Sequence, residues 1–415
     1  MLLNKPRAYE VMDKYGLDGL LAATRQNIYY LTDHWGYSSR VERTFMNYAI
    51  LPRDENGPAG LVLGSTEAGT LARDPTWVPN VVVVTGRVSP TAGNVAEVNR
   101  ERELNPMSIY LTREGAALTE DERRWTDLAM SRKGSLVATP VEGLKMLVND
   151  AGLGTGTIGT DDPRLVTWLN DMGMPGVKGV EASDVFREIR MVKSKNEIAL
   201  LRRAAQANEA AVEKTISAIK EGATLEELDR EYMLEMIRQG GRGVYILVGM
   251  VPGMRHGKVA RGEPFLVDAL GVYKHYHGDL GRTIHVGEPS ADVIQRDRAM
   301  QGGWKFACDR VRPGVRASDI VREFMDFMHQ NGFPAFNHAV AHTVGLEHTD
   351  HPLHLVHKAP GSESDFVLEE NMVLNFDMPF QEFGWGSMHI EDTLRVTRNG
   401  FEPLTSLRTE MRVLD

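Results

Sequence analysis

The chain has 415 residues, 42% of them hydrophobic and 25% charged, and a formal net charge of −10. This length exceeds one ordinary core and predicts a globular protein of two domains. The negative charge argues against nucleic acid and anionic membranes as partners, because few cations are available to neutralise phosphates.

Export and membrane insertion are not expected either. The first residues become charged after Met1 to Leu3, without the apolar core of a leader, and no run of membrane-spanning length follows. Cys308 is the only cysteine, so no internal disulfide can form, as is typical of a reducing compartment. We therefore expect a cytoplasmic protein.

The first 180 residues alternate between helix and strand patterns. An amphipathic helix is expected over 6–14, a strand over 19–23 and a helical turn at Tyr29 to Leu31. Three further strands are expected, with RDENGP as a hairpin turn between the first two, over residues 45–51, 60–63 and 81–84. This alternation predicts an N-terminal α/β domain over residues 1–180.

A glycine-rich segment near the end of this domain matches a nucleotide-binding pattern. GTGTIG, residues 154–159, fits G-x-G-x-x-G, but it follows a helix-like stretch and leads into a strand. A phosphate site needs the opposite order, in which a strand leads through the glycines to a helix N-terminus. We therefore interpret the segment as an ordinary connection.

Residues 181–415 read as two helix pairs interleaved with strands. Ser194 and Glu197 form a capping-box pattern before a long helix that we expect to end at Gly222. Thr224 and Glu227 repeat the pattern for a second helix, to about residue 239. A similar pair is expected over 291–311 and 318–331. The repetition predicts a duplicated α+β unit.

Acidic residues stand inside apolar strand patterns of this second domain. Asp268 and Asp279 are expected on two antiparallel strands around a turn near 272–274, facing one cleft. Asp377 and Glu391 each interrupt a further apolar strand. A lone acid there more often has a structural role, such as capping a turn, but burial is costly unless it is paired or bound to metal. Several such strands together favour a metal site.

Histidines gather beside these acids. Of thirteen histidines only His34 precedes residue 256, and HAVAHTVGLEHTDH, residues 338–351, holds four. If HAVAHTVG is a strand, His338 and His342 project to the same side. One imidazole added to an oxygen-rich cluster favours Mn, Fe, Co or Zn over Ca or Mg.

The order of these residues resembles that of a known family. The set resembles the metal ligands of the pita-bread peptidases, which include methionine aminopeptidase, aminopeptidase P, prolidase and the metal-free relative creatinase: Asp268, Asp279, His342, Asp377 and Glu391. KYGLDGLLAATRQNIYYLTDHWGY resembles the opening of the creatinase-type N-terminal domain, and REIRMVKSKNEIALLRRAA resembles the entry to the catalytic domain. The resemblance implies an α/β N-terminal domain followed by an α+β pita-bread domain, residues 181–415, with pseudo-twofold duplication.

The resemblance also implies roles for the ligands. Asp268 would bind one metal bidentately, and Asp279 and Glu391 would bridge two metals. His342 and Asp377 would bind the second metal. A pair of cations can activate a shared water and polarise a substrate carbonyl. One or two divalent ions are therefore expected.

Further residues would act on the substrate. His256 and His338 stand where the family keeps histidines that contact substrate, and His348 or His351 would be another donor. Asp377 or Glu391 would shuttle a proton to the leaving nitrogen. We interpret His354 and His357 as surface or supporting residues.

Two departures from the family pattern concern the metal site. Asp377 stands where the family normally has Glu, which shortens the reach of the carboxylate by roughly 1.5 Å, a large change against ligand distances held within about 0.2 Å. His389 replaces an Arg that often precedes the last ligand by two residues. These changes make a second metal and strict Xaa-Pro specificity open questions.

The leading hypothesis is a divalent-metal-dependent hydrolase of the aminopeptidase P and prolidase type, in which metal-activated hydroxide attacks the carbonyl of a short peptide or peptide-like amide. A family member with another small substrate, a creatinase-like C–N hydrolase or a metal-dependent lyase, is the alternative. A catalytically inactive pita-bread binding protein is the third hypothesis.

The resemblance further implies a homodimer, in which Trp35 and Tyr37 of one chain could cover the neighbour's site. An ordinary exposed loop is the alternative interpretation of the same residues.

Overall fold

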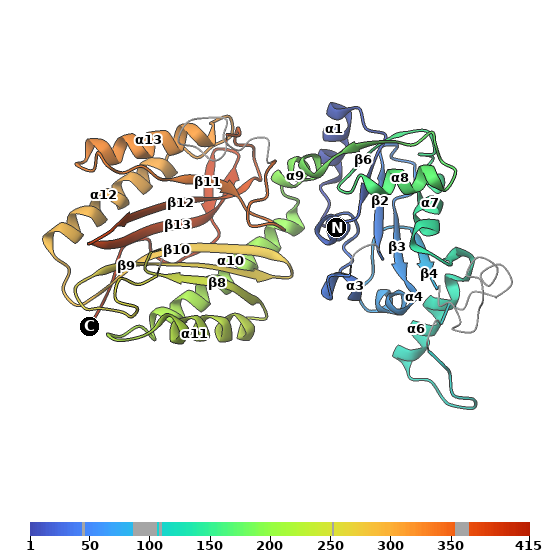
Figure 1. Ribbon diagram of the computed structural model, residues 1–415, viewed down its shortest axis with the longest axis horizontal. Helices are drawn as coiled ribbons and strands as arrows, with labels where there is room; N and C mark the ends of the chain where they lie inside the picture. Colours follow the sequence, from blue (N-terminus) through green and yellow to red (C-terminus); the bar gives the residue numbers. More distant parts are fainter. Residues whose placement is uncertain (44–45, 86–105, 108–109, 251–252, 353–364) are drawn as a thin grey trace. The chain divides into compact units, whose positions relative to one another are not determined.

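The computed structural model describes residues 1–43, 46–85, 106–107, 110–250, 253–352 and 365–415, which form two compact units, Met1–Ile189 and Arg190–Asp415 (Figure 1). The chain passes from one unit to the other within α9 (Ser183–Met191), whereas the sequence placed the division after residue 180. No helix in these described ranges is long and apolar enough to cross a membrane.

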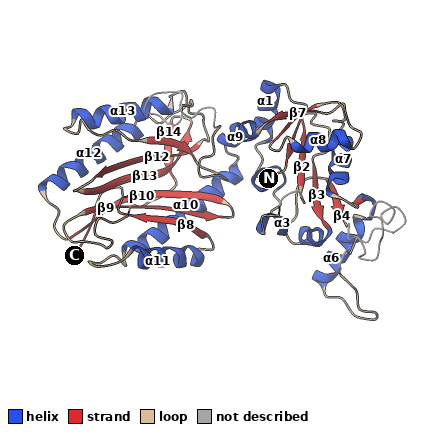
Figure 2. Cartoon of the chain, viewed as in Figure 1, coloured by secondary structure: helices blue, strands red, loops and turns tan. Residues whose placement is uncertain are grey.

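The first unit is built on a mixed seven-stranded sheet with the order β5-β4-β3-β2-β1-β6-β7. Its strands are β1 (Gly19–Ala22), β2 (Tyr48–Pro52), β3 (Gly60–Gly64), β4 (Asn80–Val84), β5 (Leu136–Val137), β6 (Thr157–Thr160) and β7 (Lys178–Glu181). Its helices are α1 (Lys5–Tyr15), α2 (Arg25–Thr32), α3 (Tyr37–Arg40), α4 (Ser65–Ala68), α6 (Glu120–Ser131), α7 (Pro140–Asp150) and α8 (Arg164–Asp171). The alternation of helices and strands confirms the α/β prediction (Figure 2).

Local signals in this unit are also confirmed. β2 and β3 pair antiparallel around the RDENGP turn, as expected, although residue 45 of the predicted strand lies outside the described residues. The glycine-rich segment 154–159 runs from α7 into β6. It therefore presents no helix N-terminus to a phosphate.

The second unit repeats one arrangement, a helix pair followed by three strands. The first copy contains α10 (Lys195–Ile216), α11 (Leu225–Arg238), β8 (Arg242–Val248), β9 (Pro264–Tyr273) and β10 (Tyr276–Val286). The second contains α12 (Ala291–Cys308), α13 (Ala317–Gln330), β11 (Val340–Thr343), β12 (Val373–Glu382) and β13 (Gly386–Thr397). The sheet order β11-β12-β13-β10-β9-β8 joins the copies at β13 and β10, which confirms the duplicated unit. β14 (Gly400–Pro403) pairs with β13, and β15 (Arg412–Leu414) pairs with β10.

Two element boundaries differ from the expectation. α10 ends at Ile216, well before Gly222, which has a φ of 86° and donates its N–H to the Val259 carbonyl at 2.8 Å. Gly222 therefore serves the turn that follows the helix. β11 begins only at Val340, so His338 precedes the strand and is exposed.

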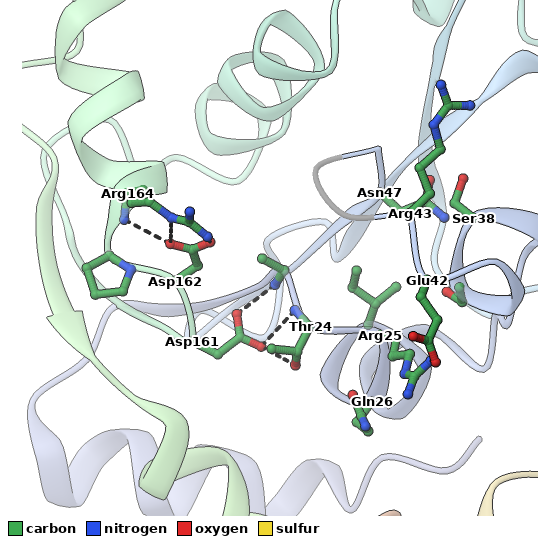
Figure 3. Close-up of a pocket in the computed structure, with 14 residues that line it drawn as sticks. Thr24, Arg25, Gln26, Ser38, Glu42, Arg43, Asn47, Asp161, Asp162 and Arg164 are labelled. Carbon is green, nitrogen blue, oxygen red and sulfur yellow. Dashed lines mark hydrogen bonds and ion pairs between the residues drawn. The ribbon is translucent and has the colours of Figure 1, made fainter.

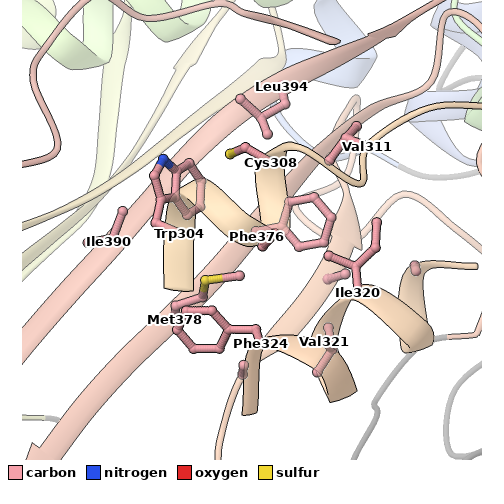
Figure 4. Packing of buried hydrophobic residues seen from close by; sticks show 14 of the residues in the cluster. Trp304, Cys308, Val311, Ile320, Val321, Phe324, Phe376, Met378, Ile390 and Leu394 are labelled. Carbon is pink, nitrogen blue, oxygen red and sulfur yellow. The ribbon is translucent and has the colours of Figure 1, made fainter. Parts of the chain in front are cut away.

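The alternation of side chains along the strands gives the sheet two different faces. In β12 and β13, Phe376, Met378 and Ile390 turn toward α12 and α13, where they pack with residues such as Trp304 and Phe324 (Figure 4). In the other half, strand side chains pack in the same way with α10 and α11. Because successive strand residues point to opposite faces, the intervening positions face away from the helices. The acidic residues occupy those positions.

Candidate metal centre

Strand register brings the predicted ligands into two neighbouring rows on the face away from the helices. In the first row Asp377 lies opposite Glu391, Glu391 opposite Gly281, and Gly281 opposite Asp268. In the second row His342 lies opposite Asn375 and Asn375 opposite Thr393, whose hydroxyl donates to the Asp279 carbonyl at 3.0 Å. The rows are two residues apart along each strand and therefore share one face.

Acids and His342 from these rows form two groups with His348 and His389. Asp279, His342 and His348 offer ligand atoms within 4.8 Å of one another, and so do Asp268, His389 and Glu391. The His348 Nε2 lies 3.1 Å from Asp279 Oδ2. The His342 Nε2 lies 3.9 Å from the same Asp279 oxygen and 3.6 Å from Glu391 Oε1, and so links the groups.

Several acidic oxygens in these groups are buried without the donors that such burial ordinarily requires. Asp279 is 1% exposed and Glu391 is 2% exposed. Among the described residues, Asp268 Oδ1 and Asp279 Oδ1 are buried and accept no hydrogen bond. Because an unsatisfied buried carboxylate is costly, a divalent cation is the natural partner for this arrangement. Oxygen-rich ligands with imidazole nitrogen suit a transition metal.

Burial and mutual repulsion set the protonation of the acids. Burial raises the pKa of Asp268 to about 7, although the nearby His389 opposes the shift. Burial also raises the pKa of Glu391 well above its usual value, and the charge of Asp279 adds to that rise. Acids that repel one another in this way gain most from a bound cation.

The histidines respond to the same surroundings. Burial lowers the pKa of His342, and the neighbouring His348 adds to the effect, which keeps the His342 imidazole neutral as a metal ligand requires. Burial would also lower the pKa of His348, but its contact with Asp279 outweighs burial and raises it.

Asp377 is arranged differently from the other predicted ligands. Its carboxylate belongs to neither group of converging ligand atoms within the described residues. The His389 Nε2 lies 2.6 Å from Asp377 Oδ1 and donates a hydrogen bond to it. Burial would raise the pKa of Asp377, but the charge of His389 outweighs burial and lowers it. Asp377 therefore pairs with His389, so the two residues at which the sequence departs from the family pattern contact each other.

The remaining predicted histidines divide between the site and its surroundings. His338 is exposed before β11, and its charge helps to lower the pKa of Asp377. The His256 ring is 53% exposed beside Glu263, 3.2 Å away, and His256 joins neither group.

Of the two alternative donors, only His348 reaches the acids. The His351 ring packs against Phe366, 5.4 Å away between centroids, and its Nδ1 accepts the Thr343 N–H. The structure therefore brings His348 to the acids and keeps His351 in the core. His354 and His357 lie outside the described residues.

Two residues that sequence reasoning did not single out complete the face. Asn375 is fully buried and donates from Nδ2 to Glu391 Oε1 at 3.0 Å. Gly281 lies under the His389 ring, since a Cβ built on it would come within 2.3 Å of His389 Nδ1. The position of Asn375 two residues before Asp377 could have indicated it, whereas nothing in the sequence indicates the space above Gly281.

A separate hollow of about 510 Å³ lies in the first unit (Figure 3). Four of the charged groups around it form ion pairs: Arg25 with Glu42 and Arg164 with Asp162. Asp161 accepts hydrogen bonds from the backbone N–H groups of Ala23 and Thr24. No histidine lines this hollow in the described part of the chain, so the converging acids and histidines of the second unit remain the candidate metal centre.

Comparison with known proteins agrees with this geometry. Residues 199–398 match the model of metallopeptidase family M24. A Xaa-Pro dipeptidase of Pyrococcus horikoshii is 28% identical over 243 residues, which cover 56% of this chain and 67% of that protein. A probable dipeptidase PepE of Mycobacterium tuberculosis is 29% identical over 252 residues, which cover 58% of this chain and 65% of that protein.

Solved structures share the fold over nearly the whole chain. An X-Pro aminopeptidase from Thermotoga maritima has a TM-score of 0.70 at 20% identity, covering 98% of this chain and 100% of that one. A prolidase from Pyrococcus furiosus has a TM-score of 0.65 at 21% identity, covering 96% and 99%. These likenesses confirm the pita-bread fold and, with the family match, the expectation of a metal-dependent hydrolase. Residues 199–398 of this chain are therefore similar to metallopeptidase family M24.

Proposed function

We propose that this chain hydrolyses short peptides, with proline after the scissile bond as the first specificity to test. The observation that carries the proposal is the cluster of buried acids and histidines in which, among the described residues, Asp268 Oδ1 and Asp279 Oδ1 accept no hydrogen bond. The dipeptidase names of its relatives support a peptide substrate.

Four of the predicted residues fit divalent cations directly: Asp268, Asp279, His342 and Glu391. When bound, one or two ions of Mn, Fe, Co or Zn would supply activation of water and polarisation of the scissile carbonyl. His348, with its raised pKa, can donate a hydrogen bond to an oxyanion beside Asp279. We assign a substrate contact to His338, which is exposed and whose charge acts on Asp377.

Proton transfer to the leaving nitrogen needs an acid that holds a proton near neutral pH. Asp377 and Glu391 lie opposite each other on β12 and β13, so both acids are candidates for this proton shuttle.

We also propose a cytoplasmic homodimer. A reducing location is supported by Cys308, which is free and buried. The dimer rests on the resemblance to the creatinase-type branch, and sedimentation of the full chain would test it.

The proposal is tested by loading metal-free protein with Mn, Co or Zn and measuring the release of free amino acid from Xaa-Pro dipeptides and tripeptides. Matched peptides with alanine in place of proline measure specificity. The Asp279→Asn variant provides the inactive control. Cleavage that requires metal and is absent in the variant supports the proposal.

Metal binding without cleavage of any peptide would contradict peptide hydrolysis. Creatinase-like C–N hydrolysis or elimination by a metal-dependent lyase would then become the reactions to test.

A further inference from the structure

His389 belongs to the group that contains the acids Asp268 and Glu391. It lies on the same face of β13 as Glu391, two residues away, and its ring covers Gly281 on the neighbouring strand. Gly281 separates Glu391 from Asp268 in the row across the sheet. Only a residue without a Cβ leaves room for the imidazole there, since the nearest ring atom would be 2.3 Å from that Cβ.

One nitrogen of this imidazole is engaged and the other is not. Nε2 donates to Asp377 Oδ1 at 2.6 Å, so Nδ1 is the ring nitrogen that a cation could occupy in place of a proton. The His389 side chain is 2% exposed, and within the described structure its Nδ1 has no hydrogen-bond partner. A buried imidazole nitrogen without a partner is costly unless it binds something.

The surroundings of the imidazole point to a cation. A ring nitrogen of His389 lies within 4.8 Å of carboxylate oxygens of both Asp268 and Glu391, and its Nε2 is 3.8 Å from Glu391 Oε2. Its Nδ1 lies over Gly281, the residue between these two acids in the row across the sheet. Histidines that bind metals commonly donate their second ring N–H to a carboxylate, which fixes the tautomer and increases the basicity of the ligand. Asp377 supplies that carboxylate here.

We propose that His389 is a metal ligand at the Asp268 and Glu391 end of the site, and that Asp377 positions it through the hydrogen bond to Nε2. Asp377 then does not bind the metal directly. The two departures from the family pattern become one change, because the shortened acid reaches the histidine that replaces the arginine. This inference rests on the proposed metal-dependent function.

The test measures metal binding rather than activity. Metal-free wild-type protein and variants are titrated with Co²⁺ by calorimetry, and the cobalt-loaded proteins are examined by proton NMR in water. A histidine bound to Co²⁺ shows a strongly shifted, exchangeable N–H resonance. His285→Gln is the matched control, because His285 is a fully buried histidine of β10 outside both groups.

Three results together would support the proposal. His389→Gln loses one shifted resonance and weakens the binding of one ion by more than about 100-fold. Asp377→Asn retains the resonance, exchanges it faster and weakens binding by about 10- to 100-fold, as is typical of residues that support a ligand. His285→Gln keeps the wild-type spectrum and affinities.

Other results would overturn it. If His389→Gln binds cobalt like the His285→Gln control and keeps every shifted resonance, His389 is not a ligand. The same holds if Asp377→Asn loses one ion while His389→Gln does not, which would make Asp377 the direct ligand. The wild-type and Asp377→Asn spectra keep the proposal testable should His389→Gln fail to fold. Wild-type protein that binds no cobalt would instead contradict the metal-dependent function itself.

Discussion

Glu67 in the first unit and Glu391 in the second are equally buried, with 1% and 2% of their surface exposed, yet their surroundings differ. Glu67 accepts hydrogen bonds from the Ser38 N–H at 2.6 Å and Asn47 Nδ2 at 3.0 Å, and it lies 3.4 Å from His34 Nε2. Burial would raise the pKa of Glu67, but these donors lower it below its usual value.

Glu391 accepts a hydrogen bond from Asn375, and the charges of three nearby acids, Asp279, Asp377 and Asp268, act against its ionisation. Burial and the charge of Asp279 raise its pKa well above the usual value. The comparison shows that burial alone does not mark a functional acid. A buried acid whose donors suffice holds the fold together, whereas one whose neighbours repel it needs a cation or a proton.

A third buried acid supports this rule. Asp350 is fully buried and pairs with Arg190 at 2.7 Å and Lys193 at 2.9 Å. Burial would raise the pKa of Asp350, but these two cations hold it far below its usual value. Asp350 follows His348 by two residues, so the ion pairs anchor the segment that carries this histidine toward Asp279.

The same substitution at the two glutamates separates the two roles most sharply. Glu391→Gln is expected to lower kcat/KM about 100- to 10,000-fold, the equivalent of several kcal/mol of lost metal-assisted catalysis. The unfolding free energy of the metal-free protein should stay the same or rise by about 1 kcal/mol, because a costly buried acid is removed. Peptide kinetics and denaturant unfolding measure the two effects. A marked loss of metal-free stability would show that Glu391 is mainly structural.

Glu67→Gln is expected to do the reverse. The amide turns a donor toward Asn47 or Ser38, so unfolding should cost about 2–3 kcal/mol less than in wild type. Since the pKa of Glu67 is lowered in the folded protein, its contribution is present above pH 4.5 and is lost as pH falls through the lower folded value. Denaturant midpoints at pH 7 and pH 4 measure this. Equal stabilities at pH 7 would refute the role of the acid in holding the fold.

Glu197 is a third buried glutamate, and its surroundings are intermediate between those of Glu67 and Glu391. It is fully buried at the N-terminus of α10, where it accepts hydrogen bonds from the Ser194 N–H and the Tyr276 hydroxyl. Burial raises the pKa of Glu197 to about 7, because these donors and Lys193 offset only part of the cost.

The sign of the pH effect follows from that raised pKa. Folded protein keeps the Glu197 proton between pH 4.5 and 7 while the unfolded chain loses it, so stability falls as pH rises through this range. Glu197→Gln removes the fall and should gain on wild type by on the order of 1–2 kcal/mol between pH 4.5 and pH 8. Glu227→Gln, in the exposed capping box of α11, measures what the substitution costs the cap itself. A constant difference between Glu197→Gln and wild type at both pH values would contradict the raised pKa.

Much of this architecture could be predicted because local patterns decide it. The capping boxes at Ser194 and Thr224 begin α10 and α11 where the sequence indicates. Period-two alternation assigned the acids of β12 and β13 to one face. Helix ends were less predictable, as α10 shows, because the loop after Ile216 is shaped by its contact with Val259.

The details of the metal centre could not be predicted, because they depend on which residues lie opposite one another. The alternation of side chains along the strands places His389 and Asp377 on one face. Only the register between β12 and β13 brings the imidazole within 2.6 Å of the carboxylate. The sequence also could not predict which of His348 and His351 contacts the acids, because loop residues have no regular alternation of side chains. Strand periodicity therefore indicates the face, and tertiary pairing selects the partner.

The smallest expected effect tests whether the first unit contributes to the site at all. Tyr37 is 58% exposed at the start of α3, and the resemblance implies that this segment covers the active site of a second chain. Tyr37→Ala should raise KM about 5-fold, which corresponds to about 1 kcal/mol from one aromatic contact, with kcat and stability unchanged. Trp35→Ala should raise KM as well, but it also removes the edge-to-face contact with Tyr29, whose ring lies 5.5 Å away, and so should lower stability. Steady-state kinetics with thermal unfolding separates the two variants. An unchanged KM in both variants would show that residues 33–40 do not contribute to the active site.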